Sequence, residues 1–479
     1  MPDQLTRILN WLTENEPQSV QRLCDWLRIP SISTDPQYTV EVKRAAQWAA
    51  DQLREAGLSV EIYPTGSPAG SGHPVVLATC PGAPDYRGPH VLFYGHYDVQ
   101  PVDPIDLWES PPFEPAIRDG VPGGPGRRIV ARGAVDDKGQ VMMFLEALRA
   151  YKAVTGQIGG GVKFTVLLEG EEESGSVNLE RFVIDHHVKL KGCDVCLISD
   201  TGMLARGKPA ITYGVRGLAY TEVTLKGPNQ DLHSGLWGGR TLNPNTELCK
   251  VLAQLWDENR RVTIPGFYEG VPPISPDEKA AWSKLGFDPA EALKAIGLPP
   301  SADLGEAGFT AMEREWARPT AEINGIYGGY TGAGAKTVIP SHATAKVSFR
   351  LVADQDPAKI VQLFFDWLKP KAPPGFTWDC KDLHGGNPAT LPIDSVHMQA
   401  AKRAITRACG AEPAMIKSGG SIPVAGLLKQ RLGISTIFMG FGLDDDRVHS
   451  PNEKFELECF RLGAASHAAF IDELTRTGR

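Results

Sequence analysis

The sequence predicts an α/β protein whose mostly parallel sheet, with helices on both faces, forms a catalytic domain interrupted by a smaller α+β domain. Short, continuous apolar runs alternate with helical segments in the first part of the chain, as in sheets that helices cover on both faces. From about residue 211 the strands instead alternate apolar and polar side chains, which is typical of a sheet with one face in water. The first pattern returns near the end of the chain, so the smaller domain is predicted to be an insertion.

The first domain can be followed element by element. The first 60 residues are expected to form helices, because apolar residues between Val20 and Leu27 recur at helical spacing before a break at Pro30-Ser31. Between the second and third of the strands below, apolar residues from Val141 to Leu148 mark one face of a helix. Four apolar runs predict buried strands at 75–79, 90–96, 162–170 and 195–199.

The second domain is predicted from its half-buried strands, at 219–227 and 343–352. Residues 265–320 are rich in Pro, Gly and acidic residues, so we expect a long connection there and no third core. The segment 433–442 followed by a terminal helix marks the return to the first domain. The predicted bounds are 1–212 and 383–479 for the two parts of the catalytic domain and 213–382 for the insertion.

Composition limits the classes of function. The chain has 479 residues, 42% of them hydrophobic and 22% charged, and a net charge of -8, which disfavours binding to a nucleic-acid backbone. Eight dispersed cysteines are too sparse for a disulfide framework. The chain start lacks the features of a secretory signal, and no apolar stretch reaches the ~18 residues of a membrane span. We expect a cytoplasmic protein with neither nucleic-acid nor membrane partners.

Polar residues collect where the predicted strands end. Each acid taken alone could equally be a helix cap or a turn residue, but imidazole and carboxylate are the ligands that zinc takes, and adjacent unpaired carboxylates would repel each other. Together they predict a dinuclear metal centre that activates a water for amide hydrolysis. The residues are His96 and Asp98 in GHYDVQP, Asp136 and Asp137 in RGAVDDKG, Glu171, Glu172 and Glu173 in LLEGEEESGS, Asp200 in ISDTG, and His449 in DDDRVHSPNE.

Seven motifs in order carry a family resemblance that runs from about residue 15 to about residue 475. The chain resembles the carnosinase-type dipeptidases, within the wider family of aminoacylases, acetylornithine deacetylases and succinyl-diaminopimelate desuccinylases. The motifs are GHYDVQP, RGAVDDKG, EGEEESGS, DLHSG, GAKTVIP, GGSIPV and HSPNE.

The resemblance implies a role for each residue of the centre. It implies two divalent ions per chain, with zinc expected and manganese or cobalt as alternatives. It also implies a cis peptide between Asp136 and Asp137. The extra acid Glu171 leaves open a shift of roles by one residue across 171–173. The implied roles are His96 and Asp200 on one metal, Glu173 and His449 on the other, Asp136 bridging, Glu172 as general base and Asp98 as the carboxylate that orients His96.

Four further residues are implied to contact substrate. His233 would enter the site of a partner subunit and hold the developing oxyanion, which implies a homodimer formed through the inserted lid and dimerisation domain. Thr337, Arg350 and Ser421 match substrate contacts, and the planar, permanently charged fork of Arg350 suits a carboxylate. A surface or core histidine and an exposed arginine on the wet face of a strand are the alternatives.

The predicted function is metal-dependent hydrolysis of dipeptides or short peptides with a free carboxylate. The alternative is an N-acyl amino acid amidohydrolase with the same centre, and a scaffolding protein would be expected to lack Glu172. GAGAKT (332–337) is not a phosphate loop, because Ala335 stands before the lysine and a strand follows. Cys193 and Cys196 lack a second pair and are expected to be inert.

Overall fold

The computed structural model describes residues 3–477, and contacts divide the chain into two compact units. The larger unit contains residues 3–213, 391–416 and 428–477, and the smaller one contains Gly214–Thr390 and Lys417–Leu427. The predicted insertion, 213–382, ends earlier than the smaller unit. The difference arises because β14 (Thr377–Gly386) runs past residue 382, and because Lys417–Leu427 includes residues that hydrogen-bond Arg216 and Arg350.

The main sheet has a parallel centre with antiparallel edges. Its order is β1-β2-β6-β3-β7-β17-β8-β15, and β16 also pairs with β8. The neighbours β6-β3, β3-β7 and β7-β17 are parallel. The strands are β1 (Ser59–Tyr63), β2 (Val75–Cys80), β3 (Val91–His96), β6 (Phe164–Glu169), β7 (Val195–Ile198), β8 (Ala210–Val215), β15 (Ala389–Thr390), β16 (Ala414–Ser418) and β17 (Ser435–Phe438).

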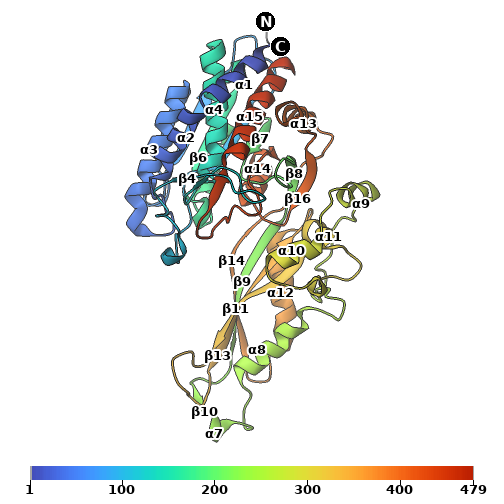
Figure 1. The fold of residues 1–479 in the computed structure, drawn as a ribbon. Coiled ribbons are helices and arrows are strands. Elements are labelled where there is room, and N and C mark those ends of the chain that lie inside the picture. The colour runs from blue at the N-terminus through green and yellow to red at the C-terminus, as the bar shows by residue number, and fades with distance from the viewer. Residues whose placement is uncertain (1–2, 478–479) are drawn as a thin grey trace. The chain divides into compact units, whose positions relative to one another are not determined.

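Helices cover this sheet. All residues of β3, β6 and β7 are buried, and since successive side chains point to opposite faces, both faces must be covered. Helix α3 contacts β1 and β2, α4 contacts β3, and α15 packs on α1, α4 and α13 (Figure 1). The helices are α1 (Gln4–Glu14), α2 (Glu16–Leu27), α3 (Thr39–Ala56), α4 (Lys138–Thr155), α5 (Leu179–Asp185), α6 (His187–Leu190), α13 (Val396–Cys409), α14 (Pro423–Leu432) and α15 (Leu457–Thr477).

The α/β prediction is confirmed, with one correction. Strand β2, predicted among the strands of a largely parallel sheet, is antiparallel to both of its neighbours, β1 and β6. A run buried on both faces has the same apolar pattern in either orientation, so the pattern could not distinguish them. A separate three-stranded sheet, β18-β5-β4, lies beside the loops of the site and consists of β4 (Ala116–Arg118), β5 (Arg128–Val130) and β18 (Lys454–Glu456).

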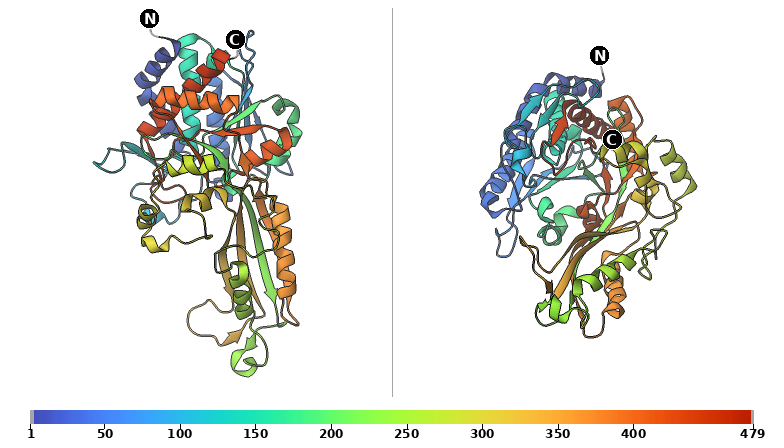
Figure 2. Two further views of the ribbon diagram at one scale, coloured as in Figure 1. Left: turned by 90° about the vertical axis from the view of Figure 1, so that its right-hand side faces the viewer. Right: turned by 60° about the horizontal axis from the view of Figure 1, so that its bottom comes forward.

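The smaller unit is built on a four-stranded antiparallel sheet of order β11-β13-β9-β14. Residues of β9 (Gly217–Lys226) alternate between buried and half-buried, as predicted for a sheet with one wet face. Helices α8 (Pro244–Leu252) and α12 (Pro357–Leu368) pack on its strands, and Figure 2 shows α12 running along them. The core between them includes Val223, Leu248, Phe349 and Phe364. The other strands are β11 (Thr320–Gly328) and β13 (His342–Leu351).

The long connection at 265–320 contains only short helices, α9 (Pro276–Ser283), α10 (Pro289–Ala295) and α11 (Ala311–Ala317). Ser275 and Thr310 begin two of them with capping boxes. This unit also contains α7 (Ser234–Trp237) and a two-stranded ribbon of β10 (Leu232–His233) and β12 (Val338–Ile339). The segment at 332–337 is a loop followed by β12, so the rejection of a phosphate loop is consistent with the structure.

Candidate metal centre

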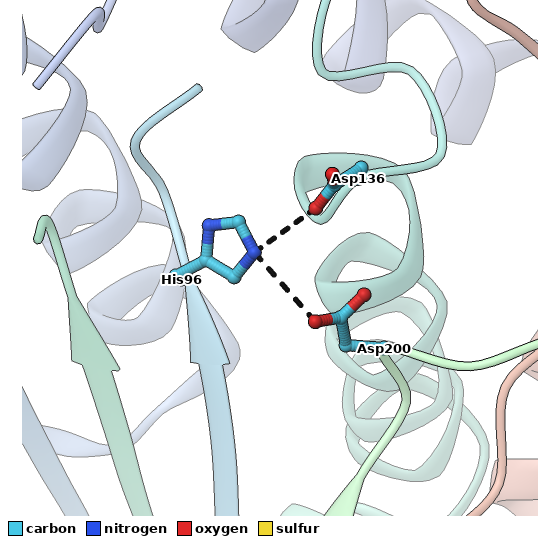
Figure 3. Close-up of side chains that lie close together, drawn as sticks. All are labelled: His96, Asp136 and Asp200. Carbon is cyan, nitrogen blue, oxygen red and sulfur yellow. Dashed lines mark ion pairs between the residues drawn. The ribbon is translucent and has the colours of Figure 1, made fainter. Parts of the chain in front are cut away.

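Three of the predicted ligands meet where the parallel strands end. His96 is the last residue of β3, Asp200 follows β7, and Asp136 lies just before α4 (Figure 3). Because β3 and β7 are parallel neighbours, their carboxyl ends share one edge of the sheet. His96 Nε2 lies 3.1 Å from Asp136 Oδ1 and 3.9 Å from Asp200 Oδ2. The Nε2 atom is buried and makes no hydrogen bond within the described residues, so it is free to bind a ligand.

A second cluster shares Asp136. His449 Nε2 lies 3.0 Å from Asp136 Oδ2 and 3.3 Å from Glu173 Oε2. In each cluster, one ligand atom from every residue lies within 4.8 Å of the others. The two oxygens of Asp136 therefore face different partners, His96 on one side and His449 on the other. The five predicted ligands thus form two adjacent groups joined by one carboxylate.

Asp98 and Gln100 support these groups from behind. Asp98 is fully buried, and its Oδ1 lies 3.4 Å from His96 Nδ1, on the opposite side of the ring from the cluster. Its Oδ2 accepts a hydrogen bond of 3.0 Å from the backbone N–H of Glu173. Gln100 Nε2 donates a bond of 2.7 Å to Glu173 Oε2. One short segment therefore positions a residue of each cluster. Asp98 was named from the sequence and Gln100 was not, although it lies in the same motif.

The three consecutive glutamates have different surroundings. The Glu171 carboxylate accepts hydrogen bonds from the backbone N–H of His73 at 2.8 Å and of Asn178 at 3.1 Å, and from the Asn178 side chain. Glu171 therefore anchors loops and belongs to neither cluster. Glu172 and Glu173 lie on a 3-10 turn, η4 (Glu172–Ser174), and only Glu173 joins a ligand cluster.

The site contains several buried carboxylates, which added positive charge would stabilise. Burial raises the pKa of Glu173 and of Asp200, to about 7 and about 6, and repulsion from Asp136 adds to both shifts. Burial also raises the pKa of Glu172 well above its usual range. Hydrogen bonds to Asp136 and Glu173 raise the pKa of His449 to about 10. The residues bind protons strongly because carboxylates outnumber imidazoles, and divalent cations would compete for the same atoms.

The loop before α4 has the backbone that the family resemblance implied. The peptide between Asp136 and Asp137 is cis. Asp137 is buried, and its Oδ2 accepts a hydrogen bond of 3.2 Å from the backbone N–H of His96. The two adjacent acids therefore have separate functions in the structure. Asp136 belongs to both clusters, and Asp137 ties its loop to the end of β3.

The four predicted substrate contacts all belong to the smaller unit, where they form two pairs. Arg350, on β13, donates a hydrogen bond of 2.8 Å from Nη1 to Ser421 Oγ. His233 and Thr337 are exposed and adjacent on the β10-β12 ribbon, where the N–H of Ser234 donates to Thr337 O. His233 Nδ1 accepts a bond of 3.0 Å from the N–H of Gly235. Within this unit, Arg350 and Ser421 are thus preorganised as a donor pair.

The family assignment follows from a comparison of the whole chain. The family model described as peptidase family M20/M25/M40 matches residues 92–473, which include all five residues of the two clusters. The chain belongs to this family. Among the M20 relatives, the Cys-Gly metallodipeptidase DUG1 of Saccharomyces cerevisiae is 32% identical over 489 residues, 98% of both chains. The Beta-Ala-His dipeptidase of Homo sapiens is 32% identical over 99% of this chain and 94% of its own.

The fold of M20 peptidases extends through the entire chain. A solved structure of the di-peptidase Dug1p from Saccharomyces cerevisiae superposes with a TM-score of 0.83 at 30% identity, covering 100% of both chains. Among the described residues, no helix is both long enough and apolar enough to cross a membrane. Cys193 and Cys196, dismissed as a metal pair, are buried and free of disulfides.

The residues of the site fit two cations. The buried, unbonded His96 Nε2, the shared Asp136 and the nitrogen and oxygen donors of both clusters match the ligands that zinc and related divalent ions take. Besides Gln100, sequence reasoning missed Glu453, the last residue of the HSPNE motif, whose carboxylate binds the loop that presents Asp136. The motif was recognised from the sequence, but a functional role was predicted only for His449 within it.

Proposed function

We propose that this chain is a metal-dependent dipeptidase that hydrolyses the amide bond of dipeptides or short peptides with a free carboxylate. The observation that carries the proposal is the pair of ligand clusters sharing Asp136, with the unassigned carboxylate of Glu172 beside them. Full-length similarity to relatives named as Cys-Gly and Beta-Ala-His dipeptidases supports the substrate class.

His96, Asp136 and Asp200 would hold one divalent ion, and Asp136, Glu173 and His449 the other. When bound, the two ions would lower the pKa of the water that Glu172 deprotonates and would polarise the scissile carbonyl. Zinc is the ion we propose, because both clusters offer imidazole and carboxylate, and manganese or cobalt would take the same donors.

Glu172 is proposed as the general base. It lies one residue from Glu173 on η4, so it is held next to the ligands without being one of them. Its carboxylate would accept the proton of the attacking water and give it to the leaving amine. Asp98 is proposed to act behind the centre, where its backbone C=O lies 3.1 Å from His96 Nδ1 and its carboxylate lies 3.4 Å from the same nitrogen and accepts from the backbone N–H of Glu173.

Arg350 and Ser421 are proposed to bind the carboxylate of the substrate, because their hydrogen bond holds a charged donor and a hydroxyl together. His233 and Thr337 are exposed on one ribbon, and we propose that His233 serves the site of a partner subunit in a homodimer formed through the smaller unit. The absence of disulfides among the eight cysteines supports a reducing, cytoplasmic location.

The test is an assay of purified protein, freed of metal and then loaded with zinc, manganese or cobalt. Substrates are Cys-Gly, β-Ala-His, their C-terminally amidated forms and an N-acetylated amino acid. We expect hydrolysis of the free dipeptides only, loss of activity in chelator, and a 10²–10⁴-fold lower kcat in Glu172→Gln with metal retained. Glu114→Gln, an exposed glutamate of the same unit, is the matched control. Faster hydrolysis of the N-acetylated amino acid would instead identify the amidohydrolase alternative.

A further inference from the structure

Glu453 binds the loop that carries Asp136. Its side chain is fully buried, and each carboxylate oxygen accepts two hydrogen bonds. Oε2 accepts from Arg132 Nη1 at 2.8 Å and from the backbone N–H of Gly133 at 3.0 Å. Oε1 accepts from the backbone N–H of Val135 at 3.0 Å and of Asp136 at 3.2 Å. A single carboxylate thus accepts from three of the four backbone N–H groups between Gly133 and Asp136, including the N–H of the shared residue itself.

The main chain of Glu453 reinforces this contact. Its C=O accepts a hydrogen bond of 3.0 Å from the N–H of Ala131, and the next residue, Lys454, begins β18, which pairs with β5. Arg132 also donates from Nη2 to the C=O of Pro101 at 2.9 Å, in the segment that follows His96 and Asp98. The loop of Asp136 is therefore held on one side by Asp137 and on the other by Glu453, which is more than 300 positions away in the chain.

The same segment carries His449 in a strained conformation. Arg447, His449 and Asn452 all have positive φ, of 57°, 60° and 63°. Non-glycine residues adopt this conformation at a cost and keep it only where their surroundings enforce it. Anchors exist on both sides of His449. Asn452 donates to Leu107 O and accepts from the backbone N–H of Glu109, both at 2.8 Å.

On the other side of His449, a buried ion pair fixes the start of the segment. Lys454 Nζ donates to the buried carboxylate of Asp446, whose Oδ2 accepts the N–H of Leu443 at 2.7 Å. The chain from 443 to 454 is therefore tied at both ends. Glu453 binds the backbone of the loop that carries Asp136, and His449 lies against the Asp136 carboxylate itself. A change at Glu453 must alter how His449 and Asp136 are placed relative to each other.

We propose that Glu453 is a positioning residue that holds Asp136 and His449 in register and so sets the metal affinity of the position they form with Glu173. The inference rests on the proposed metal centre. It predicts a larger effect on this position, which contains both Asp136 and His449, than on the other position. There, only the shared Asp136 contacts Glu453, and His96 and Asp200 are held by the ends of β3 and β7.

The test measures equilibrium zinc binding to metal-free protein by calorimetry or chelator competition. In Glu453→Gln the amide oxygen can serve only one pair of donors, and the amide nitrogen faces the other pair. We expect the position that includes His449 to lose about 10–100-fold in affinity, the range for residues that support ligands. The position that includes His96 shares only Asp136 with it and should lose less affinity.

A double-mutant cycle identifies the position affected. In a His449→Ala background only the His96 position remains strong, so adding Glu453→Gln should lower zinc affinity by a smaller factor than it does in the wild type. Glu146→Gln is the matched control, since Glu146 is a buried carboxylate paired with Arg22 that touches neither loop. It should lower the midpoint of thermal unfolding while leaving zinc affinity unchanged.

Glu453→Asp provides a second variant in which the charge opposite Arg132 is retained and the carboxylate is withdrawn by one methylene. The same selective loss is expected. Equal loss at both positions, an undiminished effect in the His449→Ala background, or wild-type affinity would overturn the inference, as would failure of both variants to fold without metal while Glu146→Gln folds. If the wild-type protein binds fewer than two ions, the proposed centre itself fails, which is a distinguishable result.

Discussion

His467 should make the protein sensitive to acid. This residue of α15 is completely buried beside Phe93 and Phe144, with ring centroids 6.1 and 5.7 Å away. Its Nε2 shares a hydrogen bond of 2.9 Å with Ser199 Oγ, and its Nδ1 has no hydrogen-bond partner within the described residues. No carboxylate is there to stabilise an imidazolium, so burial alone lowers the pKa of His467 from 6.5 to about 3.

The magnitude follows from linkage. Below pH 6.5 the unfolded chain protonates this imidazole and the folded chain does not, so the free energy of unfolding falls with pH until the folded pKa near 3 is reached. The contribution of the uncharged His467 to the free energy of unfolding is fully present above about pH 7.5 and is smaller by about 2 kcal/mol at about pH 5. The direction is the reverse of that for a histidine that gains a carboxylate partner on folding.

The assay compares urea unfolding of the wild type and His467→Gln at about pH 7.5 and about pH 5. Glutamine keeps a hydrogen-bonding group near Ser199 and does not titrate, so its own packing cost is the same at both pH values. The stability of the wild type relative to the variant should therefore fall by about 2 kcal/mol on acidification. Loss of bound metal affects both proteins alike and cancels. If the difference in stability between wild type and His467→Gln is the same at both pH values, the reasoning is refuted. His187→Gln, at an exposed position, is the control, and its difference in stability from the wild type should not change with pH.

Three further predictions concern the centre and its substrate. Glu173→Gln should lower the affinity for one of two bound ions while Glu172→Gln retains both, as elemental analysis after dialysis would report; exchanged phenotypes would mean that the roles are shifted by one residue. Arg350→Met should reduce kcat/KM for a free dipeptide towards the value for its amidated form, whereas a wild-type enzyme that treats both forms equally would exclude this role. His233→Ala should lower kcat by roughly 10²–10³, and mixing it with Glu172→Gln should restore part of the activity through heterodimers; no recovery despite proven subunit exchange would place His233 in its own chain's site, or outside catalysis.

Part of the candidate ligand clusters could be anticipated from the sequence because two of the residues follow recognisable strands. His96 ends an apolar run and Asp200 follows another, so the parallel arrangement alone brings them to one edge. The position of His449 could not be predicted in this way, because its loop runs between β17 and β18 and has an irregular backbone. Its place beside Asp136 was anticipated only through the family resemblance.

Supporting residues were harder to predict, because their contacts join backbone to side chain across the whole chain. Glu453 and the loop at 133–136 are separated by more than 300 residues, and nothing local in either segment indicates the other. The orientation of β2 was mistaken for a related reason, since a fully covered strand carries no sign of its neighbour's direction. Local patterns indicate burial and ligand type, and they do not indicate pairing.

The run of three glutamates shows how the backbone assigns different tasks to identical side chains. Glu171 precedes η4, where its C=O accepts the N–H of Ser174. Its carboxylate accepts a hydrogen bond from the Asn178 side chain. The 3-10 turn then directs the next two residues differently, so Glu173 reaches His449 while Glu172 remains outside the clusters. A ligand bound to a cation has its lone pairs engaged, whereas a base needs a free one. The turn keeps Glu173, a proposed ligand, next to the uncommitted carboxylate of Glu172, and this is the arrangement that the proposed hydrolysis by an activated water requires.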